Sequence, residues 1–319
     1  MLAALASADA VTWISISVKA LAYAATLSAI GSVLVLVVLR ELSEGGRAAL
    51  LLTAVLSALA AAIFTALRLP VRASFLMGGT LDSATDTMIL GMVAESPLGT
   101  SAALRLVGLA LILAVLWRAR TGLALALTGA FIASASFALR GHALSEPQMI
   151  LGALITLHIL CLAFWVGSFA PLARAARRDA PARAGALAHE FGRRALWAVG
   201  LVVLAGVITL GLLGAATPTA LSSPYGQMFA VKLVLFVGVL ALAAVNKLTL
   251  TPALLAAAPK SGARLRRSIR VEAGLVAGIL VTTAALTTLS APPSNSDSAQ
   301  ATLRAPQNGP VNQTHGDAS

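Results

Sequence analysis

The sequence has few charged residues and one cysteine, and both shortages restrict the class of protein. Charged residues make up 11% of the 319 residues, whereas a soluble globular domain carries about 25%. Hydrophobic residues make up 58% of the chain, and the mean hydropathy is +0.90. Cys161 lies inside an apolar run, so an intrachain disulfide and a CxxC metal or redox motif are excluded. The composition excludes a soluble globular protein and predicts one embedded in a membrane.

Eight stretches with little charge are long enough to cross a bilayer, which takes about 20 helical residues. Because a backbone amide without a partner is costly in lipid, each stretch is expected to be a helix. The sequence therefore predicts an all-α, polytopic membrane helix bundle. The predicted spans are Ile14–Leu39, Ala48–Leu67, Leu98–Trp117, Gly122–Leu139, Gln148–Leu172, Ala195–Ala216, Gly226–Asn246 and Ile269–Ser290.

Acidic residues are scarce: 12 Asp and Glu stand against 23 Lys and Arg, for a net charge of +11. The cations gather in the loops after spans one, three, five and seven, which is typical of membrane orientation and not of nucleic-acid binding. These loops hold Arg40, Arg47, Arg118, Arg120, Arg174, Arg177, Arg178, Arg183, Arg193, Arg194, Lys247, Lys260, Arg264, Arg266, Arg267 and Arg270. We expect these loops to be cytoplasmic and both termini periplasmic. Residues 1–11 lack a cationic region, so no cleaved signal peptide is expected.

An internal likeness relates the two halves of the chain. Two S-P-x-G turns, Ser96–Gly99 before Arg105 and Ser223–Gly226 before Lys232, lie 127 residues apart. An Ile-Gly-Ser triplet at residues 30–32 also matches Val-Gly-Ser at residues 166–168. With four spans in each half, the halves are predicted to be parallel four-helix repeats, residues 1–139 and 140–290, related by an axis along the membrane normal.

Two segments do not fit the count of spans. Residues 71–97 mix acidic and glycine residues with apolar ones, and this mixture predicts a segment that lies at the outer membrane interface. Residues 291–319 are rich in Ser, Asn, Gln, Asp and Thr, which predicts a disordered periplasmic tail.

His158 is the clearest candidate for chemistry because polar residues within a span are costly and therefore often functional. It lies ten residues into the fifth predicted span, about 15 Å below the start of the helix. Cys161 and Trp165 share its face. His158 is either a neutral histidine that bonds two helices together, or a metal ligand or proton carrier.

Methionines and a second histidine gather on the predicted outer side. A methionine thioether suits Cu(I), and an imidazole suits copper in either oxidation state, although methionine more often fills gaps between helices. His189, in an Arg-rich inner loop, and His315, in the tail, are expected to be solvated. The outer candidates are Met77, Met88, Met92, Met149, Met228 and His142.

Three cations lie near the outer ends of predicted helices: Lys19, Arg105 and Lys232. The simplest interpretation is that their charged ends reach water, and the alternative is that they guide an anion or set a gate. The sequence has no nucleophile elbow, phosphate-binding loop or HExxH motif, so an enzyme is not expected.

An ordered series of residues in the second half resembles the bacterial copper-resistance D (CopD) family of membrane proteins. The series comprises Gly141–Ala143, Leu157–His158, Phe164–Gly167, Pro171–Leu172, Phe191, Ser223–Gly226, Lys232–Leu233, Asn246–Lys247, Pro252, Arg266–Arg270, Glu272 and Ala291–Pro293. The resemblance implies a cytoplasmic-membrane protein of copper homeostasis that moves copper or receives it from a periplasmic carrier. His142 and His158 match the family pattern and become candidate copper ligands. Any carrier would be a separate polypeptide.

Two functions of different class follow. The first is copper transport, with import favoured: the outer methionines and His142 capture copper, His158 receives it, and Cys161 is a further soft ligand, because transport needs several weak sites. The expected partners are copper, the carrier and the lipid bilayer, without nucleic acid. The alternative is a haem-binding redox membrane enzyme, although only His158 lies clearly inside a span.

Overall fold

A computed structural model describes residues 8–80, 82–140, 146–212 and 224–289, and every regular element in these ranges is a helix. Eight of the helical segments are long and apolar enough to cross a membrane, which confirms the predicted all-α, polytopic bundle. The long helices are α2 (Ala10–Val38), α3 (Glu44–Leu76), α5 (Pro97–Ile112), α6 (Arg120–Ala135), α7 (Gln148–Arg178), α8 (Pro181–Leu212), α10 (Pro224–Val245) and α12 (Ser261–Leu289). The short elements are η1 (Asp82–Ala84), α4 (Thr87–Glu95), η2 (Leu113–Trp117), η3 (Ser136–Leu139), η5 (Asn246–Leu250) and α11 (Thr251–Leu255).

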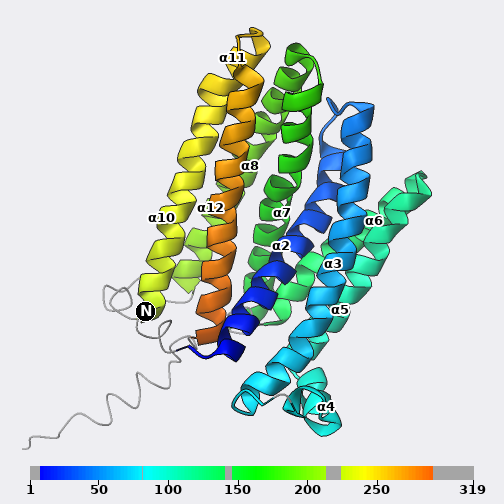
Figure 1. Cartoon of the computed structure of the whole chain (residues 1–319), viewed down its shortest axis with the longest axis vertical. Coiled ribbons are helices and arrows are strands. Elements are labelled where there is room, and N and C mark those ends of the chain that lie inside the picture. Colours follow the sequence, from blue (N-terminus) through cyan, green and yellow to red (C-terminus); the bar gives the residue numbers. More distant parts are fainter. Residues whose placement is uncertain (1–7, 81, 141–145, 213–223, 290–319) are drawn as a thin grey trace, which may run out of the picture.

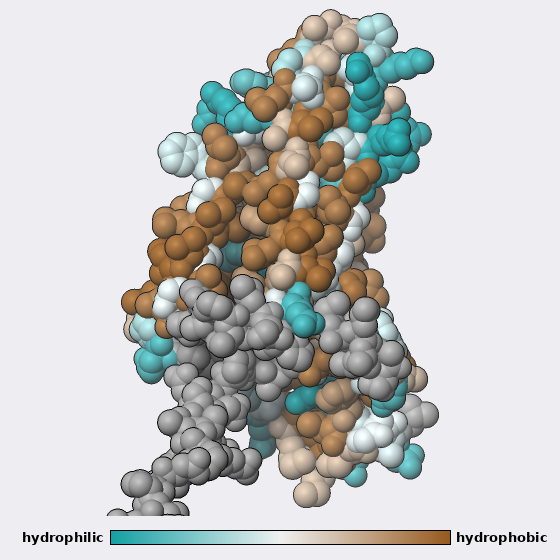
Figure 2. Space-filling view, turned by 90° about the vertical axis from the view of Figure 1, so that its left-hand side faces the viewer, coloured by the Kyte–Doolittle hydropathy of each residue, from teal (hydrophilic) through white to brown (hydrophobic). Residues whose placement is uncertain are grey.

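The long helices run up and down side by side, with α4 at one end of the bundle and α11 at the other (Figure 1). We call these the α4 end and the α11 end, which correspond to the predicted periplasmic and cytoplasmic sides. The first and last long helices meet at the α4 end, where the Lys19 ammonium donates to the Thr287 carbonyl at 3.1 Å. Hydrophobic residues cover the middle of the face shown in Figure 2, and hydrophilic residues gather toward the α11 end.

Several helices are longer than the apolar runs that predicted them. The predicted loop before Ala195 is mostly helical, because α8 already begins at Pro181, and α12 begins at Ser261 instead of Ile269. These extensions alternate arginines with side chains such as Leu187 and Leu265, which are buried in one apolar cluster. They are amphipathic helix ends, whose charge resembles that of a loop while one face packs in the core.

The predicted interfacial segment, residues 71–97, is also largely helical. Its first residues, 71–76, continue α3, while η1 and α4 form a short excursion before α5. Ser96 caps α5 by accepting a hydrogen bond from the Leu98 amide at 3.2 Å, and Pro97 occupies the first helical turn. The S-P-x-G turn is therefore a helix start, as its proline and capping serine would predict. The α10 helix likewise begins at Pro224.

Helices α2 and α7 approach each other more closely than side chains would allow. A Cβ atom added to Gly31 would overlap the Ala163 carbonyl, and one added to Gly167 would overlap the backbone of Gly31. These glycines are the centres of the two matching triplets, and they contact each other. Parallel repeats related by an axis along the membrane normal would give this arrangement; the division into repeats stays a prediction.

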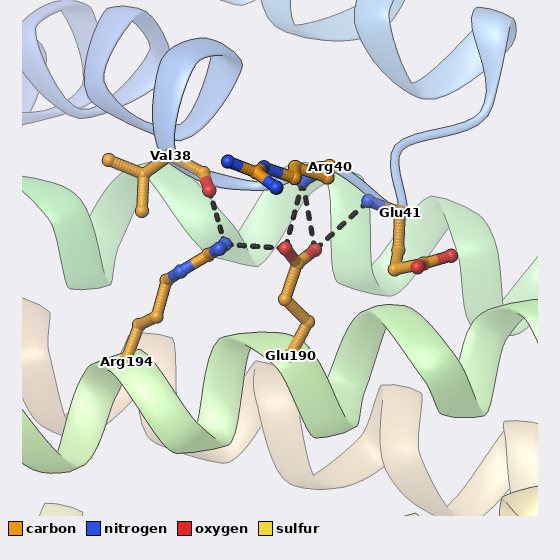
Figure 3. Close-up of polar contacts among 5 residues, drawn as sticks. All are labelled: Val38, Arg40, Glu41, Glu190 and Arg194. Carbon is orange, nitrogen blue, oxygen red and sulfur yellow. Dashed lines mark hydrogen bonds and ion pairs between the residues drawn. The ribbon is translucent and has the colours of Figure 1, made fainter.

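At the α11 end, the Glu190 carboxylate on α8 holds the end of α2 (Figure 3). It accepts hydrogen bonds from the backbone amides of Arg40, at 2.9 and 3.0 Å, and Glu41, at 2.9 Å. Arg194, one turn along α8, donates both to Glu190 and to the Val38 carbonyl. The last carbonyl of α2 and two backbone amides just after the helix thus have partners on α8. These hydrogen bonds fix the first half of the chain against the second.

We expect Gly31→Ala and Gly167→Ala each to destabilise the protein, because the added methyl group meets backbone that cannot move aside. Overpacking of this kind costs about 1–3 kcal/mol or more. Gly206→Ala is the matched control, since its added Cβ would meet nothing within 4 Å. Thermal unfolding in detergent measures the difference, and a parental melting temperature for Gly167→Ala would contradict the close contact.

Candidate functional site

His158 is half-buried on α7, ten residues from the start of that helix, which places it about 15 Å along the helix axis. Within the ranges that the structure describes, its imidazole takes part in no hydrogen bond. Lys232 of α10 lies near enough for its charge to act on the imidazole. The expected alternative of a histidine that bonds two helices together therefore lacks its hydrogen bond, and the ring nitrogens are available to a ligand.

A second polar group inside the bundle received no role from the sequence, although Glu272 and Asn246 belong to the series that resembles the copper-resistance D family. The Glu272 carboxylate on α12 is 3% exposed, and it accepts hydrogen bonds from the indole of Trp165 and from the Asn246 amide, the latter at 2.9 Å. The Asn246 Oδ1 atom and the Ser268 Oγ atom are buried and have no hydrogen-bond partner among the described residues. Glu272 is an acidic residue at the fourth position of the predicted span Ile269–Ser290, and a carboxylate within a span was the signal that could have identified it.

Glu272, Trp165 and Asn246, which we call the Glu272 group, come from three helical segments. One of these segments is interrupted at this point. Asn246 opens the π-helical turn η5, which links α10 to α11, and such turns are frequent at functional sites. Trp165 lies seven residues after His158 on the same face of α7, about 10 Å further along the axis. The two polar groups therefore lie at successive depths on one side of α7, with the carboxylate toward the α11 end.

The methionines predicted as ligands separate into two kinds. Met77, Met88, Met92 and Met149 are exposed, at 44%, 74%, 51% and 90% respectively. Met88 and Met92 are one turn apart on α4 and share a face. Met228 instead is 3% exposed and packs with Ile16 and Ala284 in an apolar cluster. Its surroundings are those of a methionine that fills space in a core.

The remaining predicted ligands do not join His158 in one group. Cys161 is buried in the apolar cluster that contains Phe164. His189, expected in a loop, lies on helix α8 and is exposed. His142 and His315 fall outside the described residues, as does the tail 291–319. In the described part of the chain, no three His, Cys, Asp or Glu side chains gather closely enough to hold a metal ion.

The interpretation that Lys19 and Arg105 reach water is wrong. Lys19 is 8% exposed and Arg105 only 1%. Lys19 donates to the hydroxyl of Thr288 at 2.6 Å, and Arg105 donates to that of Ser136 at 3.0 Å. Their polar ends point into the bundle because hydroxyl and carbonyl acceptors of neighbouring helices lie there.

The fold and these groups define a class: a multi-pass helical membrane protein with isolated ionisable side chains inside its bundle. Residues 185–286 match the family model described as copper resistance protein D, and residues 7–149 match that of the copper resistance protein D-like N-terminal domain. Together the two matches cover most of the chain, so the protein belongs to the copper resistance protein D family. Comparisons with curated proteins and with solved structures gave no match.

The matched ranges divide the candidate residues. Glu272 and Asn246 lie in the range matched by the copper resistance protein D model, and Met77, Met88 and Met92 lie in the N-terminal match. His158 and Cys161 lie between the two ranges. Their roles must therefore be argued from the structure of this chain.

Glu272 tests whether the buried carboxylate is structural or functional. Glu272→Gln should fold nearly as stably as the parent, because the Asn246 amide can turn and offer its unpartnered Oδ1 to the new side-chain amide. Glu272→Ala leaves Trp165 and Asn246 without an acceptor. This should lower the free energy of unfolding by about 1–3 kcal/mol for each buried donor. Chemical unfolding in detergent measures both, with Glu41→Ala as the control at an exposed carboxylate.

If Glu272 is only structural, the stable Glu272→Gln protein keeps its copper-dependent activity. Loss of that activity at parental stability would assign the negative charge a functional role. A Glu272→Ala protein as stable as the parent would contradict the hydrogen-bonded arrangement itself.

Proposed function

We propose that this protein binds copper at the periplasmic side of the cytoplasmic membrane and moves it inward across the bilayer. The observation that carries the proposal is His158: a half-buried imidazole in a membrane-spanning helix, without a hydrogen bond in the described ranges, in a protein of a copper-resistance family. Imidazole is a good ligand for copper. An imidazole that has no hydrogen bond within a membrane-spanning helix lowers the stability of the protein, so its presence there indicates a function.

The two polar groups along α7 supply successive sites of different chemistry. Copper held by His158 would next meet the Glu272 group, whose carboxylate is joined by the unpartnered Asn246 Oδ1. Each site offers few ligands, so each holds the ion weakly. Weak successive sites permit movement, whereas one complete cage would retain the ion.

Lys232 keeps the first site weak. Its ammonium group repels any cation on His158, because the two side chains interact electrostatically and the surrounding helices provide little screening. Removal of that charge should therefore favour copper binding at His158.

The exposed methionines are proposed to collect copper at the α4 end. Met77, Met88, Met92 and Met149 present accessible thioethers there, singly or in the one-turn pair on α4. Single thioethers are weak, exchangeable ligands, which suits transfer from a separate periplasmic carrier. Met228 packs in the core and is not proposed as a ligand. Cys161 would receive copper only after its apolar surroundings rearranged.

We expect His158→Gln to abolish most copper movement while leaving the fold intact. Glutamine is a poor copper ligand in place of imidazole, and the variant removes no hydrogen bond of the described structure. Uptake of radioactive copper into proteoliposomes measures the loss. His189→Gln, at an exposed position on α8, is the matched control and should transport at the parental rate.

Lys232→Gln serves as a companion variant and should tighten copper binding, because it removes the opposing charge. Parental transport by His158→Gln would overturn the ligand assignment without affecting membership of the family. Unchanged copper affinity in Lys232→Gln would remove the proposed link between the two side chains.

The proposed direction depends on orientation, which reporter fusions can establish. The sixteen cations of the inner loops predict that Ser261, at the start of α12, is cytoplasmic and that Ser319 is periplasmic. A reporter that is active only in the periplasm should therefore be silent at Ser261 and active after Ser319. Activity at Ser261 would reverse the assignment of the two sides.

A further inference from the structure

Five cations converge at the α4 end of the bundle, and we call them the α4-end cation cluster. Lys19 comes from α2, Arg68 and Arg72 from α3, and Arg105 from α5, while Arg140 follows η3. Lys19 interacts electrostatically with Arg68, Arg72 and Arg140, and Arg105 does so with Arg68 and Arg140. The sequence spreads these residues over about 120 positions, and the fold brings them together.

The cluster has no acidic partner in the ranges that the structure describes, where the ion pairs are Arg174 with Asp179 and Arg194 with Glu190. Three members are almost completely buried, with exposed fractions of 8% for Lys19, 6% for Arg68 and 1% for Arg105. Buried charges are normally paired. Several like charges held together with no acidic partner among the described residues are therefore an incomplete arrangement.

Aromatic rings and hydroxyl groups line the cluster but carry no negative charge. The Arg105 guanidinium lies 3.9 Å from the centre of the Phe137 ring, and that of Arg68 lies 5.7 Å from the centre of the Tyr23 ring. Within the described chain, Arg68, Arg72 and Arg140 donate no side-chain hydrogen bond. Their guanidinium donors remain available to a ligand.

A pocket of about 380 Å³ reaches the cluster between α3 and the start of α5, and Arg72 and Arg140 line it. Ser96 and Pro97, at the N-terminus of the 16-residue helix α5, form another part of its wall. The N-terminal end of a helix favours an anion. Two guanidinium groups and a helix N-terminus thus face one cavity, in front of three buried cations.

We propose that this pocket binds a phosphate group through Arg72 and Arg140. Guanidinium groups bind phosphate with paired, charge-assisted hydrogen bonds, and a phosphate offers oxygens in several directions to donors from different helices. Its negative charge offsets part of the positive charge of the cluster. Copper is not needed for this binding, so the proposal stands independently of the proposed transport.

The lining of the pocket is suited to a phosphate carried on an apolar body. Leu76 and Met92, each 51% exposed, line the same pocket as the two arginines. The pocket also lies at the start of α5, which opens a segment long and apolar enough to span a membrane. Such segments end near the region where lipid headgroups meet water. The phosphate can therefore come from a phospholipid headgroup or from free phosphate, and the experiment must separate these sources.

The test uses the full chain, purified in detergent and stripped of lipid, at constant ionic strength. Melting temperature and native mass spectrometry are recorded with inorganic phosphate, with phosphatidylglycerol and with a diacylglycerol of the same chains. The test variant is the double substitution Arg72→Gln and Arg140→Gln at non-buried side chains. The control, Arg47→Gln and Arg178→Gln, removes the same charge from exposed positions at the α11 end.

We expect phosphatidylglycerol to bind and stabilise the parent and the control, with affinity at least about tenfold weaker in the test variant, as loss of charge-assisted hydrogen bonds would give. Binding of inorganic phosphate alone, lost in the same variant, would support the site with free phosphate as its source. The proposal is overturned if neither phosphate compound binds the parent, if diacylglycerol stabilises equally, or if both double variants behave alike.

Discussion

The contact between α2 and α7 is the constraint on which the rest of the structure depends. Helices in lipid gain little from hiding apolar side chains from one another, so they associate through close packing at small residues. Gly31 and Gly167 bring the two backbones together. Because α7 carries both His158 and Trp165, this contact sets the position of the free imidazole and lets the indole reach Glu272. The clamp formed by Glu190 fixes the same pair of halves at the α11 end.

The protein treats its buried acidic and basic groups differently. Glu190 and Glu272 each accept hydrogen bonds from two or more residues, and Glu190 also pairs with Arg194. Both carboxylates are thus held in place by donors within the fold, although two donors do not use every lone pair of Glu272. In the described part of the chain, the cations at the α4 end have no acidic partner and His158 has no hydrogen bond. Since polar groups in a bilayer need partners, these groups point to ligands from outside the chain.

The spans could be predicted from the sequence because an apolar run of about 20 residues is a local property. The ends of α8 and α12 could not, since an amphipathic helix end rich in arginine resembles a loop. The buried carboxylates were missed for a different reason. Their partners are remote: Arg40 is 150 residues from Glu190, and Trp165 is 107 from Glu272. The convergence of five cations likewise depends on how four segments pack.

The two proposed ligands influence each other through charge. Met92 lines the pocket that Arg72 and Arg140 also line, so a copper ion there meets two positive groups. At an effective dielectric constant of 20, two unit charges 8 Å apart repel by about 2 kcal/mol. A bound phosphate offsets part of that positive charge and makes the approach of a cation to α4 less unfavourable. Because binding linkage is reciprocal, copper on the methionines would strengthen phosphate binding by the same factor, and an occupied pocket would be the state in which the α4 end collects copper.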